Sequence, residues 1–362
     1  MLLEPLGKQK YQSLKKLFMQ TVMVTGGTGY IGSHTAVELI NEGFRVLIAD
    51  NLSNSEAGVL DGIEKITGVR PGFEELDICD EAALKSYLDR NPEISAIIHF
   101  AAFKAVGESV DKPLKYYRNN LVSLINLLEQ MLIRSITNLV FSSSCTVYGQ
   151  PDLLPVTESA PVKKAGSPYG NTKKISEDII ADTIHSDPSI KAVSLRYFNP
   201  IGAHPSALIG ELPRGVPDNL VPFITQTAIG VRDVLKVFGD DYNTPDGSCI
   251  RDYLHVTDLA KAHVTAIKRL IENKNKDNYE VFNLGTGQGV SVLEMIKTFE
   301  KVNSVSLNYT ITGRRPGDTE QVWADTTLAN RELGWKAGSS LEEALATAWK
   351  WEKYYRESKQ DK

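Results

Sequence analysis

The chain has 362 residues, a formal net charge of −5 and 42% hydrophobic residues, which is enough for two globular domains. Lys and Arg number 40 against 45 Asp and Glu, so the sequence lacks the strongly basic character typical of nucleic-acid-binding domains. The three cysteines are scattered and form no Cys-x-x-Cys pair, which predicts neither a metal site nor a disulfide framework. No apolar run approaches the length of about 18–20 residues that spans a bilayer. We therefore expect a soluble, cytoplasmic protein.

The start of the chain is rich in lysine, but no apolar block follows as it would in a secretory signal. Residues 1–19 are therefore expected to be an N-terminal extension. From residue 20 onward, short β-branched runs alternate with amphipathic stretches. These runs are apolar without strict alternation, as in strands buried on both faces of a parallel sheet. Strands are predicted at residues 22–24, 45–49, 96–98, 139–141 and 192–195.

A helix is predicted to begin after Asp80 and to close at Asn91-Pro92. The alternation of strands and helices predicts a doubly wound, Rossmann-type parallel sheet in an α/β fold. After about residue 199 the pattern changes to loops rich in Pro and Gly, with helices predicted at 257–273, 291–302 and 339–356. We therefore predict a first domain over residues 20–199 and a smaller α/β domain over 200–362, from which some segments return to the first.

The first predicted strand leads directly into a glycine-rich turn, Thr25-Gly26-Gly27-Thr28-Gly29-Tyr30-Ile31-Gly32. Gly26, Gly29 and Gly32 would give a tight turn, a close approach to a pyrophosphate and close helix–sheet packing. A plain turn would also explain the glycines, but the second strand ends in Asp50. A carboxylate there can bind the adenosine ribose hydroxyls and repels a 2′-phosphate. Because Asn51 rather than Arg follows it, the pattern favours NAD over NADP.

A second group of polar residues lies at and beyond the end of the fifth predicted strand, Ser142-Ser143-Ser144, with Tyr169 and Lys173 further on. On a helix, residues four apart share a face, so the Lys173 ammonium is expected near the Tyr169 phenol. The spacing alone is weak evidence, because Tyr11/Lys15 and Tyr355/Lys359 repeat it, as solvated helix faces do.

The position of this group is more informative than its spacing. Ligands of doubly wound sheets bind at the carboxyl ends of the strands, where Ser144 and Tyr169 would both point. A neighbouring cation and a positively charged nicotinamide would lower the pKa of Tyr169, and a decrease from 10 to about 7 corresponds to roughly 4 kcal/mol. The group therefore suits acid/base chemistry at an alcohol.

Other motifs follow in a recognisable order: Ala102-Phe103-Lys104-Ala105-Val106-Gly107-Glu108-Ser109, Thr146-Val147-Tyr148-Gly149, Arg196-Tyr197-Phe198-Asn199-Pro200, Arg251-Asp252-Tyr253-Leu254-His255-Val256 and Trp323-Ala324-Asp325. Together with the glycine-rich turn and the Ser144, Tyr169 and Lys173 group, they resemble the UDP-glucose 4-epimerase family. These enzymes are extended short-chain dehydrogenase/reductases, and the resemblance covers residues 20–355.

The resemblance implies reversible epimerisation at carbon 4 of UDP-glucose and UDP-galactose. Tyr169, as the phenolate, would take the proton of the 4-hydroxyl while hydride passes to NAD, and Ser144 would bond the same oxygen. Lys173 would bind the nicotinamide ribose and lower the Tyr169 pKa. The 4-keto sugar would then turn and take the hydride back on its other face. NAD would therefore remain bound as a prosthetic group.

The resemblance also implies a set of binding residues. For NAD these are Gly26, Gly29, Tyr30, Ile31, Gly32, Asp50, Asn51, Asn54, Ser55, Asp77, Ile78, Phe100, Ala101, Lys104, Asn119, Tyr169, Lys173 and Tyr197. For the UDP-sugar they are Lys104, Ser144, Tyr169, Phe198, Asn199, Asn219, Leu220, Arg232, Arg315, Asp318 and Val322. From chemistry alone, arginines on loops suit a diphosphate, although a solvated surface arginine is the alternative for each.

Val322 precedes the Trp-Ala-Asp motif at a position where family members restricted to glucose and galactose commonly carry Tyr. A smaller side chain would leave room beside the 2-position of the sugar. We therefore expect that UDP-N-acetylglucosamine and UDP-N-acetylgalactosamine can also be accepted.

Two other functions remain open at this point. A 4,6-dehydratase or decarboxylase of the same fold would need an acidic residue directly after the serine, where this chain has Cys145-Thr146. An inactive NAD-sensing regulator would tend to lose the Tyr or the Lys, and both are present. The resemblance further suggests a homodimer formed through helices at about 113–134 and 168–186. The apolar face of the first helix would also fit burial in the core.

Overall fold

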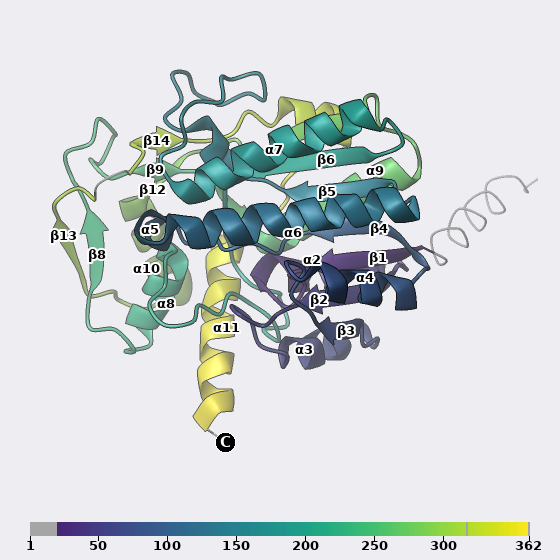
Figure 1. Cartoon of the computed structure of the whole chain (residues 1–362). Helices are drawn as coiled ribbons and strands as arrows, with labels where there is room; N and C mark the ends of the chain where they lie inside the picture. Colours follow the sequence, from purple (N-terminus) through teal and green to yellow (C-terminus); the bar gives the residue numbers. More distant parts are fainter. Residues whose placement is uncertain (1–19, 316–317, 361–362) are drawn as a thin grey trace, which may run out of the picture.

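The computed structural model describes residues 20–315 and 318–360, so the predicted extension over residues 1–19 lies outside the described residues. Within this part of the chain, parallel strands form a seven-stranded sheet in the order β11-β6-β5-β4-β1-β2-β3 (Figure 1). Its strands are β1 (Thr21–Thr25), β2 (Arg45–Asp50), β3 (Gly72–Glu75), β4 (Ile94–His99), β5 (Asn138–Ser142), β6 (Lys191–Tyr197) and β11 (Tyr279–Leu284). All five strands predicted from the sequence belong to it, and the doubly wound α/β fold is confirmed.

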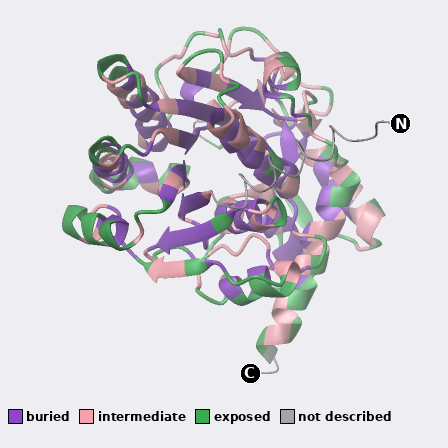
Figure 2. Cartoon of the chain, turned by 90° about the vertical axis from the view of Figure 1, so that its right-hand side faces the viewer, coloured by how far each residue is buried: buried purple, intermediate pink, exposed green. Residues whose placement is uncertain are grey.

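Helices cover both faces of this sheet. One face carries α4 (Glu81–Arg90), α6 (Pro113–Arg134) and α7 (Pro168–Ser186), and the other carries α2 (Tyr30–Asn41), α3 (Val59–Thr67) and α9 (Val256–Ile271). Neighbouring strand residues point to opposite faces. Val22 and Val24 pack with the α2 side, whereas Met23 packs with the α6 side. Figure 2 shows the strands buried and the outer surfaces of the helices exposed.

The second half of the chain adds a smaller group of elements beyond the carboxyl ends of the strands, at the left of Figure 1. Its core is formed mainly by α8 (Leu220–Ala228), β8 (Leu235–Phe238), α10 (Val292–Asn303) and α11 (Leu341–Gln360). Three small sheets belong to it: β7 (Asn199–Ile201) with β10 (Tyr253–His255), β8 with β13 (Tyr309–Thr312), and β9 (Ile250–Arg251) between β12 (Val290–Ser291) and β14 (Gln321–Val322). Although they follow residue 199, α9 and β11 pack with the large sheet.

Local signals fix the start of the two helices that matter most for the sequence predictions. Asp80 caps α4 by accepting a hydrogen bond from the Ala83 N–H at 3.0 Å, as the sequence predicts. Ser167 caps α7 in the same way, and Pro168 occupies its first turn. This places Tyr169 and Lys173 in the first two turns of α7. The remaining short elements are α5 (Val106–Asp111) and the single turns Cys145–Tyr148 and Ala329–Leu333.

The order of the strands creates one crevice. From β1 the chain builds outward to β3 and then crosses to β4 on the other side of β1. In doubly wound sheets, ligands bind outside the carboxyl ends of the strands at this reversal. Among the described residues, no helix is both long and apolar enough to cross a membrane.

Candidate active site

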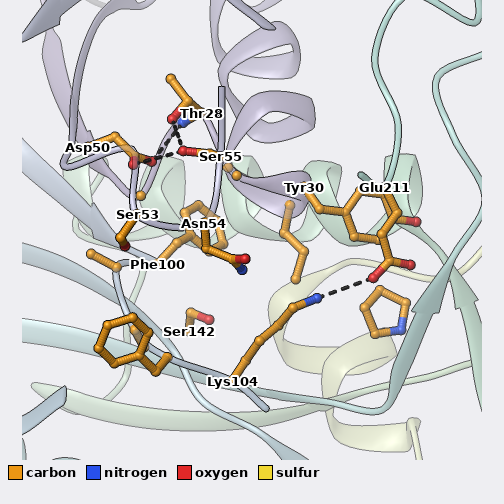
Figure 3. Close-up of a pocket in the computed structure, with 18 of the residues that line it drawn as sticks. Thr28, Tyr30, Asp50, Ser53, Asn54, Ser55, Phe100, Lys104, Ser142 and Glu211 are labelled. Atoms are coloured by element: carbon orange, nitrogen blue, oxygen red, sulfur yellow. Dashed lines mark hydrogen bonds and ion pairs between the residues drawn. The ribbon is translucent and has the colours of Figure 1, made fainter. Parts of the chain in front are cut away.

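A cavity of about 350 Å³ lies at this crevice, between the strand ends and the loops of the second half. Residues that follow β1, β2, β4, β5 and β6 all reach it. Every residue that the sequence predicts for cofactor binding lines it: Gly26, Gly29, Tyr30, Ile31, Gly32, Asp50, Asn51, Asn54, Ser55, Asp77, Ile78, Phe100, Ala101, Lys104, Asn119, Tyr169, Lys173 and Tyr197. Part of the cavity is drawn in Figure 3.

The glycine-rich turn forms one wall with bare backbone. Gly26 has a φ of +68°, and a Cβ there would lie 2.8 Å from the Ala101 nitrogen. A Cβ on Gly32 would lie 2.3 Å from the Gly26 carbonyl oxygen. Helix α2 then begins after Gly29 without a side-chain cap, so its first N–H groups are free to bind an anion. This wall fits a pyrophosphate.

Asp50 lies at the end of β2 beside this turn (Figure 3). Its carboxylate accepts hydrogen bonds from the Leu52 N–H at 2.9 Å, the Thr28 N–H at 3.2 Å and the Ser55 hydroxyl at 3.0 Å. The side chain is thus held in place, with its negative charge in the cavity where an adenosine ribose is expected. The bare turn and the fixed carboxylate together fit NAD and disfavour a 2′-phosphate.

Ser144, Tyr169 and Lys173 meet in the same cavity. Ser144 follows β5 and caps the turn Cys145–Tyr148, with its hydroxyl accepting the Thr146 N–H at 3.2 Å. Tyr169 is almost fully buried, and burial raises its pKa well above 10. The neighbouring Tyr197 acts in the same direction, whereas the Ser144 hydroxyl favours the phenolate. Desolvation of the phenolate dominates among the contributions of the protein itself. The decrease predicted from the sequence depends in addition on the positive charge of a nicotinamide.

Lys173 is held at the end of β5. Its ammonium donates to the Ser142 carbonyl oxygen at 2.5 Å and lies 4.8 Å from the centre of the Phe141 ring. Burial lowers the pKa of Lys173 to about 8, and the carboxylate of Glu177 opposes this decrease. The ammonium is thus held against the end of β5 rather than bonded to the phenol.

The residues predicted for the sugar nucleotide fall into two groups. Lys104, Ser144, Tyr169, Phe198, Asn199 and Asn219 line the cavity. Leu220, Arg232, Arg315, Asp318 and Val322 are not among the lining residues. Leu220 nevertheless opens α8 directly after Asn219. Val322 is buried in the same hydrophobic cluster as Phe198, which lines the cavity.

The two predicted arginines lie in different places. Arg232 donates through Nε to Gln226 Oε1 at 2.8 Å and lines a separate small pocket against α11. Arg315 donates to Asp318 at 2.6 Å, and Arg251 Nη2 lies 3.9 Å from the same carboxylate.

Arg251 was missed as a site residue by sequence reasoning, although it opens one of the recognised motifs. Cys145 lines the cavity beside Ser144, and burial raises the pKa of its thiol to about 12. The positive charge of Arg251 is close enough to oppose this increase. Arg251 therefore connects the cavity to Arg315 and Asp318. Glu211 was also missed, because nothing in its local sequence marks it; its carboxylate faces Lys104 in the cavity (Figure 3).

Comparisons with known proteins identify the family of this chain. A family model described as GDP-mannose 4,6 dehydratase matches residues 23–348. A UDP-glucose 4-epimerase of Bacillus subtilis is 50% identical over 331 residues, covering 91% of this chain and 96% of the relative. The chain belongs to the UDP-glucose 4-epimerase family. This confirms the resemblance, within the extended short-chain dehydrogenase/reductases.

Solved members of this family share the fold over nearly the whole chain. The crystal structure of a UDP-glucose 4-epimerase from Stenotrophomonas maltophila, with bound NAD and formylated UDP-arabinopyranose, has a TM-score of 0.90 and 46% identity. The structural match covers 94% of this chain and 99% of the Stenotrophomonas protein. The epimerase from Bifidobacterium longum, in complex with NAD⁺ and UDP, has a TM-score of 0.89 and 45% identity over 93% of this chain and 99% of its own.

Proposed function

We propose that this chain is an NAD-dependent isomerase that interconverts UDP-glucose and UDP-galactose by epimerisation at carbon 4. The observation that carries the proposal is the meeting of Ser144, Tyr169 and Lys173 with the glycine-rich turn and Asp50 in one cavity. Alcohol chemistry and dinucleotide binding thus share one site. Asn199 and Asn219, from the second half of the chain, close it on the substrate side.

NAD, when bound, supplies a hydride acceptor and donor and a positive charge on its nicotinamide. Tyr169, as the phenolate, would take the proton of the 4-hydroxyl while the hydrogen of carbon 4 leaves as hydride, and the Ser144 hydroxyl would bond the same oxygen. The 4-keto sugar turns and receives hydride on its opposite face, and Tyr169 returns the proton. Burial raises the pKa of Tyr169, and the Ser144 hydroxyl opposes that increase. The positive charge of a bound nicotinamide would lower the pKa further.

The diphosphate of the sugar nucleotide is assigned to Arg251 and Arg315. These arginines share Asp318, which orients them, and Arg251 lies beside Cys145 next to the reacting centre. The N-terminus of α8 after Asn219 lacks a side-chain cap and adds free N–H groups. Arg232, which lies in the separate pocket, then has no direct part in binding the substrate.

Val322 supports a wider substrate range that includes UDP-N-acetylglucosamine and UDP-N-acetylgalactosamine. It packs in the buried cluster with Phe198, which lines the cavity, so its size sets how far that wall can yield. A tyrosine ring at this position would add bulk to the cluster that contains Phe198.

The matching family model is described as a dehydratase, so dehydration is the competing function. Loss of water across carbons 5 and 6 needs an acid/base residue beside Ser144. Cys145 lines the cavity at that position, and burial raises the pKa of its thiol to about 12, so it is neutral at physiological pH. Epimerisation, which needs only the Ser, Tyr and Lys group, fits this chemistry better.

Incubation of the purified chain with UDP-galactose, without added NAD, tests the proposal. We expect UDP-glucose as the product and no net formation of NADH. Tyr169→Phe should lose nearly all turnover while its NAD content stays at the wild-type level. A 4-keto-6-deoxy product would indicate the dehydratase, and NAD binding without turnover of any UDP-sugar would indicate a regulator.

The same proposal includes a cytoplasmic homodimer, with residues 20–199 mainly binding NAD and residues 200–362 mainly binding the UDP-sugar. Exposed apolar side chains on α5 and α6 support the dimer, since Val110 is 60% and Leu114 80% exposed. Helices α6 and α7 lie side by side on one face of the molecule (Figure 1). Light scattering of the wild type and of Leu114→Glu would test this, with a dimer expected for the first and a monomer for the second.

A further inference from the structure

Glu211 is a carboxylate in a cavity that is expected to hold two diphosphates, and the proposed chemistry does not use it. It comes from the loop between β7 and α8, in the second half of the chain. Its side chain is only 11% exposed, so a charge there needs a partner. A negative group placed among expected phosphates therefore requires an explanation.

The contacts of Glu211 join the two halves of the site. Its Oε1 accepts a hydrogen bond from Lys104 Nζ at 3.2 Å and from Asn219 Nδ2 at 2.6 Å. Lys104 follows β4 on the cofactor side, whereas Asn219 directly precedes α8 on the substrate side. One oxygen atom thus fixes a residue from each side, and a shift of either one changes the position of the other.

The backbone around Glu211 is fixed as well. The indole N–H of Trp351, on α11, donates to the Glu211 carbonyl oxygen at 2.9 Å. The preceding Gly210 lies so close to that indole ring that a Cβ would be 2.4 Å away. On the opposite side of the cavity, Arg214 of the same loop donates to the carbonyl oxygens of Ser53 and Ser55, beside Asp50. The carboxylate is therefore presented by an anchored loop that spans the cavity.

We propose that Glu211 couples UDP-sugar binding to NAD retention by holding Lys104 and Asn219 on one carboxylate oxygen. This rests on the proposed function. A ligand that orders Asn219 fixes Glu211, which fixes Lys104 against the cofactor, so that a ligand bound second pays a smaller ordering cost. Coupling is reciprocal, so UDP should slow the loss of NAD. Such a link would keep the cofactor in place during the turn of the 4-keto sugar.

The rate of NAD release from the holoprotein, with and without UDP, tests the coupling. Released NAD is converted to NADH by excess alcohol dehydrogenase and ethanol and followed by fluorescence. Coupling free energies between sites typically correspond to factors of about 5–150. We therefore expect UDP to slow release from the wild type at least about fivefold, and from Glu211→Gln less than about twofold.

Two further variants make the test specific. Lys104→Met cuts the other end of the link and should also reduce the UDP effect to less than about twofold, which keeps the test informative if Glu211→Gln does not fold. Glu56→Gln is the matched control, since Glu56 lines the same cavity and its nearest cation is Lys359, at 3.9 Å, on α11. This control should keep the wild-type ratio.

The coupling would be overturned if UDP slowed NAD release from both Glu211→Gln and Lys104→Met as much as from the wild type. It would also be overturned if UDP did not change the rate of NAD release from the wild type. Loss of the UDP effect in Glu56→Gln as well would also overturn the assignment to Glu211. Epimerisation of UDP-galactose by the same wild-type preparation separates the two proposals. An active enzyme without a UDP effect refutes only the coupling, and an inactive one refutes the proposed function.

Discussion

A buried ion pair between Glu177 of α7 and Arg196 of β6 holds the helix that carries Tyr169 and Lys173 against the sheet. Arg196 donates to the carboxylate through Nη2 at 2.6 Å and Nε at 3.0 Å, and the Ser143 hydroxyl donates to it at 2.5 Å. Both charged side chains are 8% exposed. Glu177 stands one turn after Lys173 on the same helix, so this pair supports both the fold and the charge of the site.

Replacing Glu177 by Gln leaves the Arg196 charge buried and without its carboxylate. Breaking a buried pair from one side typically costs about 3–5 kcal/mol of unfolding free energy, whereas replacing both partners by apolar side chains is often neutral. We therefore expect a decrease of about 3–5 kcal/mol in Glu177→Gln and recovery to within about 1 kcal/mol of the wild type in the double variant Glu177→Met with Arg196→Met. Urea unfolding measures both.

Removal of the Glu177 charge should also move the pH profile. Coulomb's law at about 6 Å and an effective dielectric constant of about 20 gives about 3 kcal/mol between Glu177 and the Lys173 ammonium, at most about two pKa units. Glu177 raises the pKa of Lys173, so without it that pKa falls further below 10.5. If turnover needs the ammonium, the alkaline limb of kcat moves to lower pH by about one to two units in both variants.

Within the described part of the chain, the groups near this lysine that bear on the profile include Glu177 and Tyr169 on its own helix, His99 on β4 and the Ser142 carbonyl on β5. Burial holds the pKa of His99 at about 3, so His99 stays neutral across the alkaline limb. As a matched control, Glu93→Gln removes a carboxylate from an exposed pair with Arg45 and should cost less than about 1 kcal/mol without moving the limb. An unmoved limb in the Glu177 variants, or a double variant as unstable as Glu177→Gln, would refute the reasoning.

Other variants separate the remaining roles. Burial lowers the pKa of Lys173 to about 8, so the unfolded chain binds the Lys173 proton more tightly than the folded chain does. The cofactor-free Lys173→Met variant should therefore be more stable than the wild type in urea unfolding. The difference in stability should be largest near pH 7 and should decrease between about pH 8 and 10.5. Arg251→Met should raise KM for UDP-galactose about tenfold or more, since a charge-assisted hydrogen bond contributes about 1.5–3 kcal/mol. Arg232→Met should change KM less than about threefold. Equal effects of the two substitutions would contradict the assignment of the diphosphate to Arg251. Val322→Tyr should abolish turnover of UDP-N-acetylglucosamine and keep that of UDP-glucose in coupled assays, and a wild type without N-acetyl activity would refute this.

The residues that the sequence predicts for the cofactor come together in one cavity, and their sequence signals are local. The glycine-rich turn, Asp50 at the end of β2 and the serines at the end of β5 each follow a buried strand, and parallel topology then brings all strand ends to one edge. Burial on both faces forces these strands to be apolar throughout, so their ends are easy to find. The helix caps at Asp80 and Ser167 are local in the same sense, because the capping side chain and its partner are three residues apart.

The substrate half depends on contacts between residues that are distant in the sequence, and local patterns do not encode these. Arg232 and Arg251 are both arginines near the ends of short elements, and only the folded chain separates the one beside Gln226 from the one beside Asp318. The Lys173 ammonium shares a helix face with the Tyr169 phenol, yet the Ser142 carbonyl holds it, because a buried ammonium must satisfy its donors.

Glu211 gives the clearest physical reason for this limit. Its partner Lys104 lies 107 residues earlier in the chain. The loop that carries Glu211 is anchored by Trp351, and this anchor positions the carboxylate that accepts from Lys104. A carboxylate in a phosphate-binding cavity would look unfavourable from composition alone, since like charges repel. It becomes favourable only when a lysine and an amide converge on it, and that convergence is a property of the packed loop rather than of the sequence around Glu211. The proposed coupling between the two ligands therefore depends on contacts between the two halves of the chain, which only the folded structure brings together.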